Sequence, residues 1–327
     1  MRTIFSRIIV SFVLGFVLVC GVFAAAQKQE GAAGYPSRNI EFIVGSTAGS
    51  GSDLMARALA MEMKLSQPII VVNRAGAGGT VATTEVKNAR ADGHTILYGA
   101  VGPFVTQPHL LDIQYSLDDF RYIAPLAYEP LFLAVKADSP WKTPRDLNNA
   151  FAKGGGQTLK FGSSSPGSVP HLAQEVLFKQ MNISADHVPF PGDNEAIIAL
   201  LGGHIQALTA HVGGLIKHVE AGELRLLGIY SPNRFELTPN VPTLKEQGYD
   251  INLSAYRFIA VSKALPNDIV GIIEKAANEA KNTPSFIEFL KRIYALPYNI
   301  SEAELTAQIK RDNQMYGVVI KELGLKN

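Results

Sequence analysis

The sequence predicts an α/β protein with two domains, and three observations support this prediction. Short β-type runs alternate with longer amphipathic segments from about residue 35 to the end of the chain, an order typical of doubly wound sheets. Turns rich in glycine and serine follow two of these runs, at residues 45–52 and 163–168. Finally, a chain of 327 residues exceeds what one compact core usually holds, so two domains of roughly 120 to 170 residues are expected.

The composition is that of an ordinary globular protein. Hydrophobic residues make up 47% of the chain, charged residues 18%, and the formal net charge is +1. A nucleic-acid-binding surface would need a clustered excess of basic residues. We therefore expect no nucleic-acid partner.

The N-terminal segment predicts export. Residues 1–7 are basic, residues 8–19 form an apolar run too short to span a bilayer with margin, and small residues follow at positions 24–26. This order is typical of a signal peptide. We expect a signal peptide over residues 1–26, a flexible leader over residues 27–34 and a periplasmic mature protein.

Cys20 is the only cysteine, so no disulfide within the chain is available. Its place at the end of the apolar run would suit lipid attachment. However, Val19 is larger than the small residue that normally precedes a lipidated cysteine. We favour a soluble periplasmic protein and keep a lipid anchor at Cys20 as the alternative.

The first informative turn, residues 45–52, lies between an apolar run at residues 40–44 and an apolar-periodic segment at residues 54–60. We interpret these segments as strand and helix, with Ser52 or Asp53 as the helix N-cap. Glycines let the backbone approach a ligand, and the first N–H groups of the helix lack partners within it. The turn therefore suits a carboxylate or phosphate, although small-residue turns are also ordinary punctuation in α/β proteins.

Two further segments extend the pattern. Residues 68–73 predict a strand that a glycine-rich turn follows, and residues 91–99 predict another turn and strand. Together with later motifs, this ordered set resembles the periplasmic solute receptors of tripartite tricarboxylate transporters, the Bug-type binding proteins. The matching segments, spread over nearly all of the mature chain, are residues 35–38, 48–53, 73–79, 92–95, 167–168, 171–172, 188–190 with Gly192, 202–203, 241–243 and 248–249.

A second turn repeats the design of the first. Residues 131–135 and 159–162 predict strands, and between them Thr143 is expected to cap a helix that ends at Phe151. Residues 163–171 then bring hydroxyl side chains and a glycine to the start of another helix. Two such turns could face one ligand.

The next stretch predicts more strand and helix pairs. A strand begins at Asp186, a helix covers residues 195–201, and strands cover residues 205–209 and 224–230. His204, His211 and His218 are spaced seven apart, which on one helix would line a face. We expect the glycines at positions 213 and 214 to interrupt such a helix, so we predict no metal site.

The last stretch returns to the first domain. Residues 255–261 predict the returning strand, and helices are expected over residues 266–280, 284–293 and 301–323, the last beginning with a capping box at Ser301. By the resemblance, the fold is a two-domain periplasmic binding protein, type II-like, with a hinge and a ligand cleft. Domain 1 would comprise residues 35–130 and 255–327, and domain 2 residues 131–254.

The resemblance also implies the ligand site, in which one turn per domain holds a carboxylate through backbone N–H and hydroxyl groups. His211 could contact a distal polar group or satisfy a backbone carbonyl. Where many relatives have proline and an aromatic residue, this chain has Gly45 and Ser46, which should widen the pocket. The expected ligand-binding residues are Ser46, Thr47, Ala48, Ser50, Ser52, Gly102, Ser163, Gly167, Ser168 and His211.

Enzyme functions fit less well. The glycines of neither turn in the first domain complete a Gly-x-Gly-x-x-Gly/Ala fingerprint, and the second strand ends in Asn73 where a dinucleotide site needs an acidic residue. Pro166 follows the serines of the second turn where a nucleophile elbow needs glycine. We expect no catalytic residues, no cofactor and no metal, and keep a phosphate-binding exported enzyme as the second class.

The resemblance thus implies an extracytoplasmic receptor that binds a small organic acid and delivers it to a tripartite tricarboxylate-type secondary transporter. Its partners would be a small and a large integral membrane subunit, and the receptor itself is expected to be a monomer. A sensor that docks on a receptor kinase is the alternative among binding proteins. The sequence does not specify the acid.

Overall fold

The computed structural model describes residues 34–153, 155–253 and 255–325. The predicted signal peptide, Cys20 and most of the predicted leader lie outside these residues. No helix among the described residues is long and apolar enough to cross a membrane.

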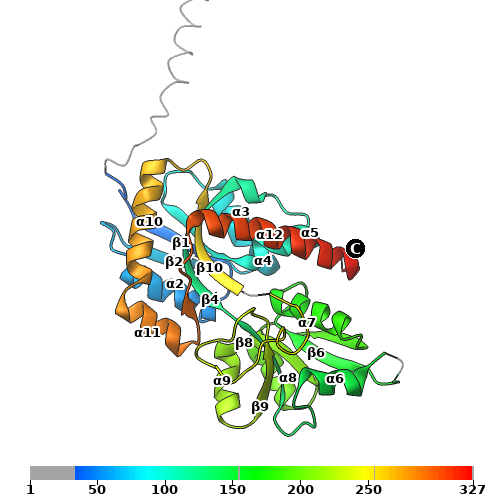
Figure 1. Ribbon diagram of the computed structural model, residues 1–327. Coiled ribbons are helices and arrows are strands. Elements are labelled where there is room, and N and C mark those ends of the chain that lie inside the picture. Colours follow the sequence, from blue (N-terminus) through cyan, green and yellow to red (C-terminus); the bar gives the residue numbers. More distant parts are fainter. Residues whose placement is uncertain (1–33, 154, 254, 326–327) are drawn as a thin grey trace, which may run out of the picture. The chain divides into compact units, whose positions relative to one another are not determined.

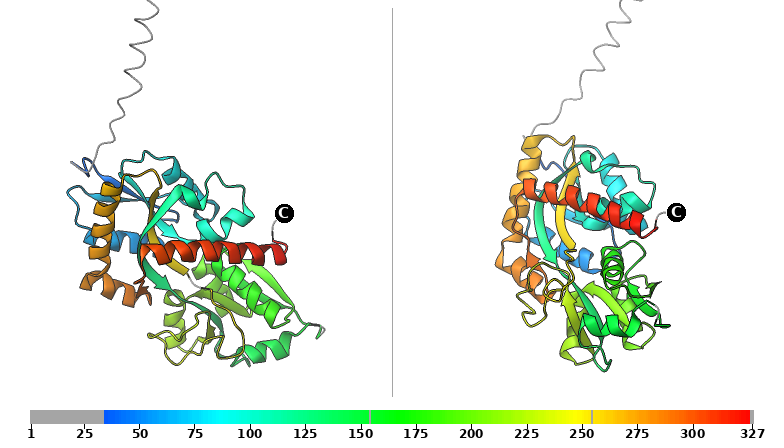
Figure 2. Two further views of the ribbon diagram at one scale, coloured as in Figure 1. Left: turned by 45° about the horizontal axis from the view of Figure 1, so that its top comes forward. Right: turned by 45° about the vertical axis from the view of Figure 1, so that its right-hand side comes forward.

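A six-stranded sheet contains strands from both ends of the described chain, so that early (blue) and late (yellow) segments lie side by side in Figures 1 and 2. β1 pairs in parallel with β2 and β3, and β10 pairs antiparallel with β3 and β4. In the order β11, β4, β10, β3, β1 and β2, the strands are Leu296–Pro297, Phe120–Glu129, Ala255–Ser262, Thr95–Ala100, Ile40–Val44 and Ile69–Asn73.

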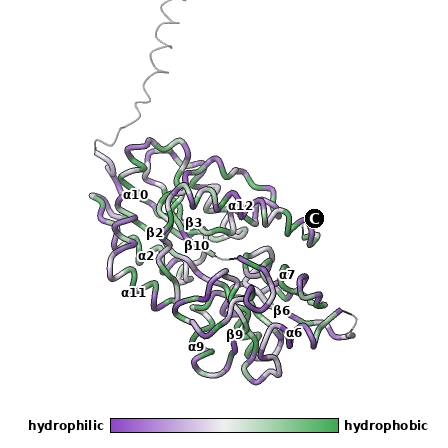
Figure 3. The backbone as a smooth tube through the Cα atoms, viewed as in Figure 1, coloured by the Kyte–Doolittle hydropathy of each residue, from purple (hydrophilic) through white to green (hydrophobic). Residues whose placement is uncertain are grey.

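Nine short and long helices accompany this sheet among the described residues. They are α2 (Gly51–Glu62), η1 (Ala77–Gly79), α3 (Thr80–Asn88), α4 (Val101–Val105), α5 (Gln107–Leu110), η2 (Leu117–Asp119), α10 (Asn267–Lys281), α11 (Pro284–Arg292) and α12 (Glu302–Glu322). Figure 3 shows hydrophobic and hydrophilic residues alternating along α10 and α12, as expected for helices that bury one face.

A five-stranded sheet is built entirely from the middle of the chain. β6 pairs in parallel with β7 and β8, whereas β5 pairs antiparallel with β8 and β9. In the order β7, β6, β8, β5 and β9, the strands are Ala185–Pro189, Leu159–Ser163, Ala207–His211, Leu131–Lys136 and Leu224–Ile229. Its helices are α6 (Pro144–Phe151), α7 (Val169–Gln180), α8 (Asp193–Leu201) and α9 (Val212–Glu220).

The two sheets confirm the predicted α/β class, and most predicted strands and helices are present. Three local predictions were wrong. Ser50, not Ser52 or Asp53, caps α2, because its hydroxyl accepts from the Asp53 N–H. β8 ends at His211, two residues later than predicted, and α9 starts at once and includes Gly213 and its neighbour. Glycine weakens a helix by only about 1 kcal/mol, which tertiary packing evidently outweighs.

An aromatic cluster fixes the junction between β3 and α4, where the candidate site begins. The ring of Phe104 in α4 is fully buried and meets the rings of Phe120, Tyr122 and Phe258 at centroid distances of 5.3, 5.2 and 5.6 Å. Edge-to-face pairs of this kind each contribute about 0.5–1.5 kcal/mol beyond the area they bury. The start of α4 is therefore held rigidly against β4 and β10.

Candidate ligand-binding site

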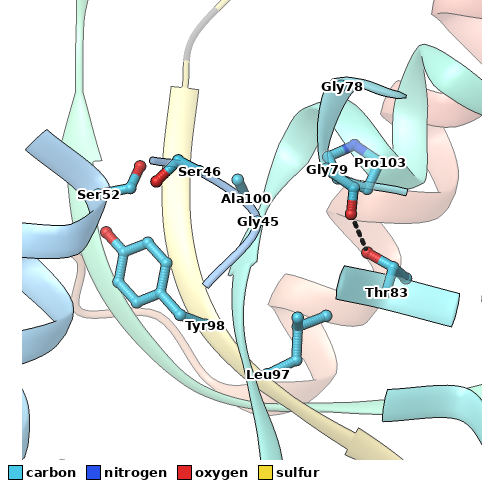
Figure 4. Close-up of a pocket in the computed structure, with 10 residues that line it drawn as sticks. All are labelled: Gly45, Ser46, Ser52, Gly78, Gly79, Thr83, Leu97, Tyr98, Ala100 and Pro103. Carbon is cyan, nitrogen blue, oxygen red and sulfur yellow. Dashed lines mark hydrogen bonds between the residues drawn. The ribbon is translucent and has the colours of Figure 1, made fainter. Parts of the chain in front are cut away.

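A cavity of about 60 Å³ lies at the carboxyl ends of β1 and β3. This volume is well above the roughly 10–15 Å³ that one water needs. Figure 4 shows the hydroxyl groups of Ser46, Ser52 and Tyr98 at one side of the cavity, and Gly78, Gly79 and Pro103 at the other. The lining is completed by Gly45, Thr83, Leu97 and Ala100. No lining side chain carries a formal charge.

Helices begin at three points of this lining. Ser52 lies in the first turn of α2, Gly79 is the N-cap of α3, and Ala100 is the N-cap of α4. No side chain hydrogen-bonds the N-terminal N–H groups of α3 or α4 as a cap. Free N–H groups and the helix dipole favour an anion at such positions. The cavity is therefore suited to a small anionic group.

A buried carboxylate holds the first turn in shape. Asp53 is 2% exposed and accepts hydrogen bonds from Gly49 N–H at 2.8 Å, Arg57 Nε at 3.0 Å and Asn73 Nδ2 at 3.0 Å. Asn73 Nδ2 also donates to the Ser46 carbonyl at 3.1 Å. The hydrogen bond from Arg57 lowers the pKa of Asp53 against the opposing effect of burial. Arg57 thus reaches back to the turn, but it does not line the cavity.

Close backbone packing explains two glycines of the cavity. A methyl group on Gly45 would lie 3.0 Å from the Gly79 Cα, so the strand end and the glycine turn touch directly. Gly79 has φ +94°, and a methyl group there would lie 2.8 Å from Pro103 Cγ. The space beside the Gly45 Cα is therefore filled by protein.

The predicted residues of the first turn divide into two groups. Ser46 and Ser52 line the cavity. Ser50 bonds the Ser46 hydroxyl at 2.7 Å and caps α2, and it does not line the cavity. Thr47 and Ala48 are exposed on the turn and Gly102 lies within α4, also outside the lining.

The second turn has its hydroxyl groups turned inward. Ser163 is fully buried, and its Oγ lies 2.7 Å from His187 Nε2 and donates to the Ser165 carbonyl at 3.2 Å. The His187 ring stacks on His171 with centroids 3.7 Å apart, and the Gly167 N–H donates to His171 Nδ1 at 2.9 Å. Burial, and then the nearby His171, lower the pKa of His187 to about 3.

Ser168 acts as the N-cap of α7. Its hydroxyl accepts from the His171 N–H at 3.4 Å and donates to the Ser165 carbonyl at 2.8 Å. Ser168 is only partly buried, unlike Ser163.

Gln107 in α5 brings the second turn close to the cavity. A methyl group on Gly78, which lines the cavity, would lie 2.6 Å from Gln107 Nε2, and one on Gly167 would lie 3.9 Å from the same atom. Gln107 is 6% exposed. One buried amide therefore lies between the glycine-rich turn that lines the cavity and the second turn.

His211 lies at the end of β8, where its Nδ1 is 2.9 Å from Asp193 Oδ2. Neither predicted partner, a distal ligand group or a backbone carbonyl, takes this nitrogen. Burial lowers the pKa of His211, whereas the hydrogen bond and the charge of Asp193 together raise it by more, so the net shift of the pKa is upward. A second and more deeply buried ion pair, Arg257 and Glu129, lies where the chain passes between the sheets, with Nη2 and Oε2 2.6 Å apart.

Sequence reasoning missed several of these residues. Tyr98, Gly78 and Gly79 line the cavity. They lie inside a predicted strand and a predicted glycine-rich turn, but none of the three was expected to bind the ligand. Arg257 had a clear signal, because it is the only charge within an otherwise apolar strand. Among the described residues, no group of three or more His, Cys, Asp or Glu side chains could hold a metal ion.

Comparisons with known proteins agree with this geometry. A profile described as the tripartite tricarboxylate transporter family receptor matches residues 55–325. The chain is 32% identical over 305 residues to a UPF0065 protein of Cupriavidus necator, which covers 92% of each chain. It is 29% identical over 321 residues to the protein BugT of Bordetella pertussis, which covers 95% of this chain and 96% of BugT.

Solved structures show the same fold. A TctC solute-binding protein from Polaromonas, solved without ligand, is 32% identical, with a TM-score of 0.75 over 88% of this chain and 99% of that one. An R. palustris protein solved with adipate shares the fold at 24% identity, with a TM-score of 0.79 over 89% of this chain and 98% of that one. The fold is thus that of a two-domain periplasmic binding protein, and the chain belongs to the family of tripartite tricarboxylate transporter receptors, which are periplasmic solute-binding proteins rather than enzymes.

Proposed function

We propose that the protein is an extracytoplasmic receptor that binds a small organic acid and delivers it to a tripartite tricarboxylate-type secondary transporter. The observation that carries the proposal is the uncharged cavity at the N-termini of α2 and α3, lined by the hydroxyl groups of Ser46, Ser52 and Tyr98. Neutral donors of this kind bind a carboxylate in a site from which water is excluded. Similar proteins solved with malate and with adipate support a carboxylate ligand.

The two turns would contribute unequally. Ser46 and Ser52 would donate to the carboxylate from the first turn, and the backbone of Gly167 and Ser168 would approach it from the second. Ser163 is fully buried and bonded to His187, so a role beneath the turn suits it better than a ligand contact. Thr47, Ala48 and Ser50 do not line the cavity, so the cavity adds no support for their predicted contacts with the ligand.

Closure of two domains would complete the site. We propose residues 35–130 and 255–327 as one domain and residues 131–254 as the other, because the strands of the two sheets divide in this way. Residues of the two proposed domains already touch: Lys179 Nζ lies 2.7 Å from Glu322 Oε2, and Tyr294 donates to Glu220 at 3.0 Å. Hinge closure would exclude water and so strengthen hydrogen bonds to the ligand.

A thermal-shift screen tests the ligand class. The mature protein, from about residue 27, would be heated with citrate, malate, succinate, adipate and glutamate, and with the corresponding dimethyl esters as controls. We expect at least one acid and no ester to raise the melting temperature, because binding to the folded state stabilises it by mass action. A screen in which no acid acts, or in which the protein converts the acid chemically, would contradict the proposal.

A pull-down tests the partner. The liganded receptor should retain an integral membrane protein with many transmembrane spans from membranes of cells that express the transporter. Retention of a receptor kinase in its place would favour the sensor function.

A further inference from the structure

The side chain of Gln107 is a buried amide that uses none of its hydrogen-bonding groups within the protein. Gln107 is the first residue of α5 and is 6% exposed. Its side-chain amide makes no hydrogen bond to another described residue. An amide offers two donors on Nε2 and an acceptor on Oε1, and buried polar groups normally have partners. Gln107 therefore suits a polar group that comes from outside the protein.

Two glycines locate this amide. A methyl group on Gly78 would lie 2.6 Å from Gln107 Nε2, and a Cα–Cβ bond adds about 1.5 Å, so Nε2 lies within about 4.1 Å of the Gly78 Cα. A methyl group on Gly167 would lie 3.9 Å from the same nitrogen, which places Nε2 within about 5.4 Å of the Gly167 Cα. Gly78 lines the cavity and Gly167 belongs to the second turn. The amide therefore lies at the border of the cavity, where a ligand that extends beyond its carboxylate must continue.

Packing holds the Gln107 side chain in place. Gly78 has φ +62°, and any side chain there would overlap the Gln107 amide, so the glycine lets the amide lie directly against the backbone. Thr106 before it is fully buried, and its hydroxyl donates to the Gly102 carbonyl at 3.1 Å. The Leu111 N–H donates to the Gln107 carbonyl at 2.9 Å. The amide is thus fixed without using its own donors and acceptor.

The cavity and the amide offer different hydrogen-bonding groups. The first turn supplies hydroxyl and N–H donors, which suit a carboxylate because a carboxylate only accepts. Oε1 of Gln107 is an acceptor, so a carboxylate cannot use it. A hydroxyl group on the carbon next to the carboxylate can donate to Oε1 and accept from Nε2. An α-hydroxy acid therefore gives both sides of the amide a partner, whereas an unsubstituted acid leaves Oε1 unpaired.

An amino group at the same place fits less well. It is a cation at neutral pH, and a buried cation needs an anionic partner. Among the described residues, no acidic side chain lines the cavity. The carboxylate of Asp53 behind the first turn is already bonded to Arg57. The neutral amide of Gln107 therefore favours a hydroxyl group over an ammonium group.

We propose that Gln107 binds a hydroxyl group on the carbon next to the ligand's carboxylate, so that the receptor prefers α-hydroxy acids. This inference rests on the proposed function, in which the cavity holds the carboxylate. Gln107 would then decide specificity within the class of organic acids, while the first turn binds the group that all of them share.

Titration calorimetry with matched acids tests the inference on the mature protein. The probes are butyrate with α-hydroxybutyrate and α-aminobutyrate, and succinate with malate and aspartate, using both enantiomers of each substituted acid. We expect the better enantiomer of at least one hydroxy acid to bind about tenfold or more tightly than its unsubstituted parent, because a site built for a hydroxyl leaves polar groups unpaired when the hydroxyl is missing. The amino acid of that series should bind no more tightly than the parent.

Two variants change the amide and keep its length. Gln107→Met removes both hydrogen-bonding groups, and should reduce the preference for the hydroxy acid to about twofold or less while the affinity of the unsubstituted acid stays within about threefold. Gln107→Glu replaces the amide by a carboxylate, which an ammonium group needs as a partner. In this variant the amino acid should bind more tightly than the hydroxy acid. A purely structural role of Gln107 predicts no such reversal.

Gln247→Met is the matched control. Gln247 is half-buried, its Nε2 donates to the Leu227 carbonyl at 2.9 Å, and it does not line the cavity. Its replacement removes a bonded amide far from the ligand in sequence and in function. The control should therefore keep the preference of the natural protein for the hydroxy acid.

Three results would overturn the inference. Equal binding of hydroxy and unsubstituted acids by the natural protein would show that no hydroxyl is read, while the proposed function would stand. A preference that survives in folded Gln107→Met would assign the hydroxyl to another residue. Absence of binding for every acid would contradict the proposed function as well. Melting temperatures separate misfolding from lost recognition, and the reversal expected in Gln107→Glu decides if Gln107→Met does not fold.

Discussion

The two strand-to-helix turns are alike in sequence and opposite in construction. In the first turn, Ser46 and Ser52 present hydroxyl groups to a cavity while buried Asp53 holds the backbone from behind. In the second turn, Ser163 faces inward onto a histidine stack, and Gly167 bonds the same stack. Hydroxyl side chains thus face a cavity in the turn that a buried carboxylate supports, and in the second turn Ser163 faces inward and supports the turn itself.

The largest expected effect tests the support of the first turn. Asp53→Ala removes the acceptor for Gly49, Arg57 and Asn73 and leaves buried donors without partners, so we expect the free energy of unfolding to fall by about 3 kcal/mol. Urea unfolding measures it. Asp146→Ala is the control, because Asp146 accepts two backbone N–H groups but is not buried as Asp53 is, and a clearly smaller loss is expected there. Equal losses would contradict the assigned role of Asp53.

Two glycines of the first proposed domain test whether close packing around the cavity supports ligand binding. Gly79→Ala must accommodate φ +94° and a contact of 2.8 Å with Pro103, whereas Gly49→Ala has φ +81° and no atom within 4 Å. We expect a loss of about 2–3 kcal/mol for Gly79→Ala and about 1 kcal/mol for Gly49→Ala. Only Gly79→Ala should also weaken carboxylate binding, because Pro103 lines the cavity. Calorimetry measures the affinity of both variants, and urea unfolding measures their stability. An equal effect of the two substitutions on affinity would show that the cavity is not the ligand site.

Single hydroxyl deletions compare the turns directly. Ser52→Ala should weaken carboxylate binding about tenfold, or about 1.4 kcal/mol, with little change in melting temperature. Ser163→Ala should lower the free energy of unfolding by about 1–2 kcal/mol, because His187 loses its partner, and leave affinity unchanged. Ser168→Ala is the intermediate case: a loss of about 1 kcal/mol of stability is expected from the cap alone. Affinity loss in Ser163→Ala without loss of stability would reverse the assignment.

We expect acid to lower the stability of the protein through His187, which bonds Ser163 of the second turn. The pKa of His187 is lowered to about 3 in the folded protein, against about 6.5 in an unfolded chain. Between these values only the unfolded chain takes up the proton, so stability is full above about pH 6.5 and falls as pH decreases toward 3. His187→Gln should flatten this fall, whereas His204→Gln, at an exposed position, should not. Unfolding curves measured across this range decide, and an unchanged slope in His187→Gln would contradict the assignment.

The smallest expected effect is that of salt on the first turn. No lining residue of the cavity carries a formal charge, and neutral donors in a closed site are screened weakly. The affinity for a monocarboxylate should therefore change by less than about tenfold between low and near-molar salt. A larger loss would show that an arginine or lysine holds the carboxylate.

The fold was largely predictable because its signals are local. Strand β1 matches its predicted bounds, and α6 and the capping box at Ser301 were placed correctly. The errors concern where a helix begins: the Ser50 hydroxyl caps α2 because it bonds both the Ser46 hydroxyl before the helix and the Asp53 N–H inside it. The helix through Gly213 exists because Val212 and Leu215 are buried, which composition alone does not reveal.

Only part of the site was predictable, because the direction in which a side chain points depends on tertiary packing. The sequence identifies both turns, yet it does not show that Ser163 faces a histidine from a neighbouring strand. Pairing across long separations also hid the partnership of Arg257 with Glu129, which only the antiparallel register of β10 and β4 creates.

The strand order has a consequence for how an exported chain folds. The five-stranded sheet is complete once Ile229 is available, whereas β4 pairs, among the described residues, only with β10 and β11, both of which come later in the chain. Contacts between segments so far apart form slowly, because a long loop must close first. During this interval β4 is a ten-residue, mostly apolar strand with two unpaired edges, a template for aggregation. A chain that stops before Ala255 would keep that strand open, and we expect residues 120–129 to need protection from association until β10 and β11 are available.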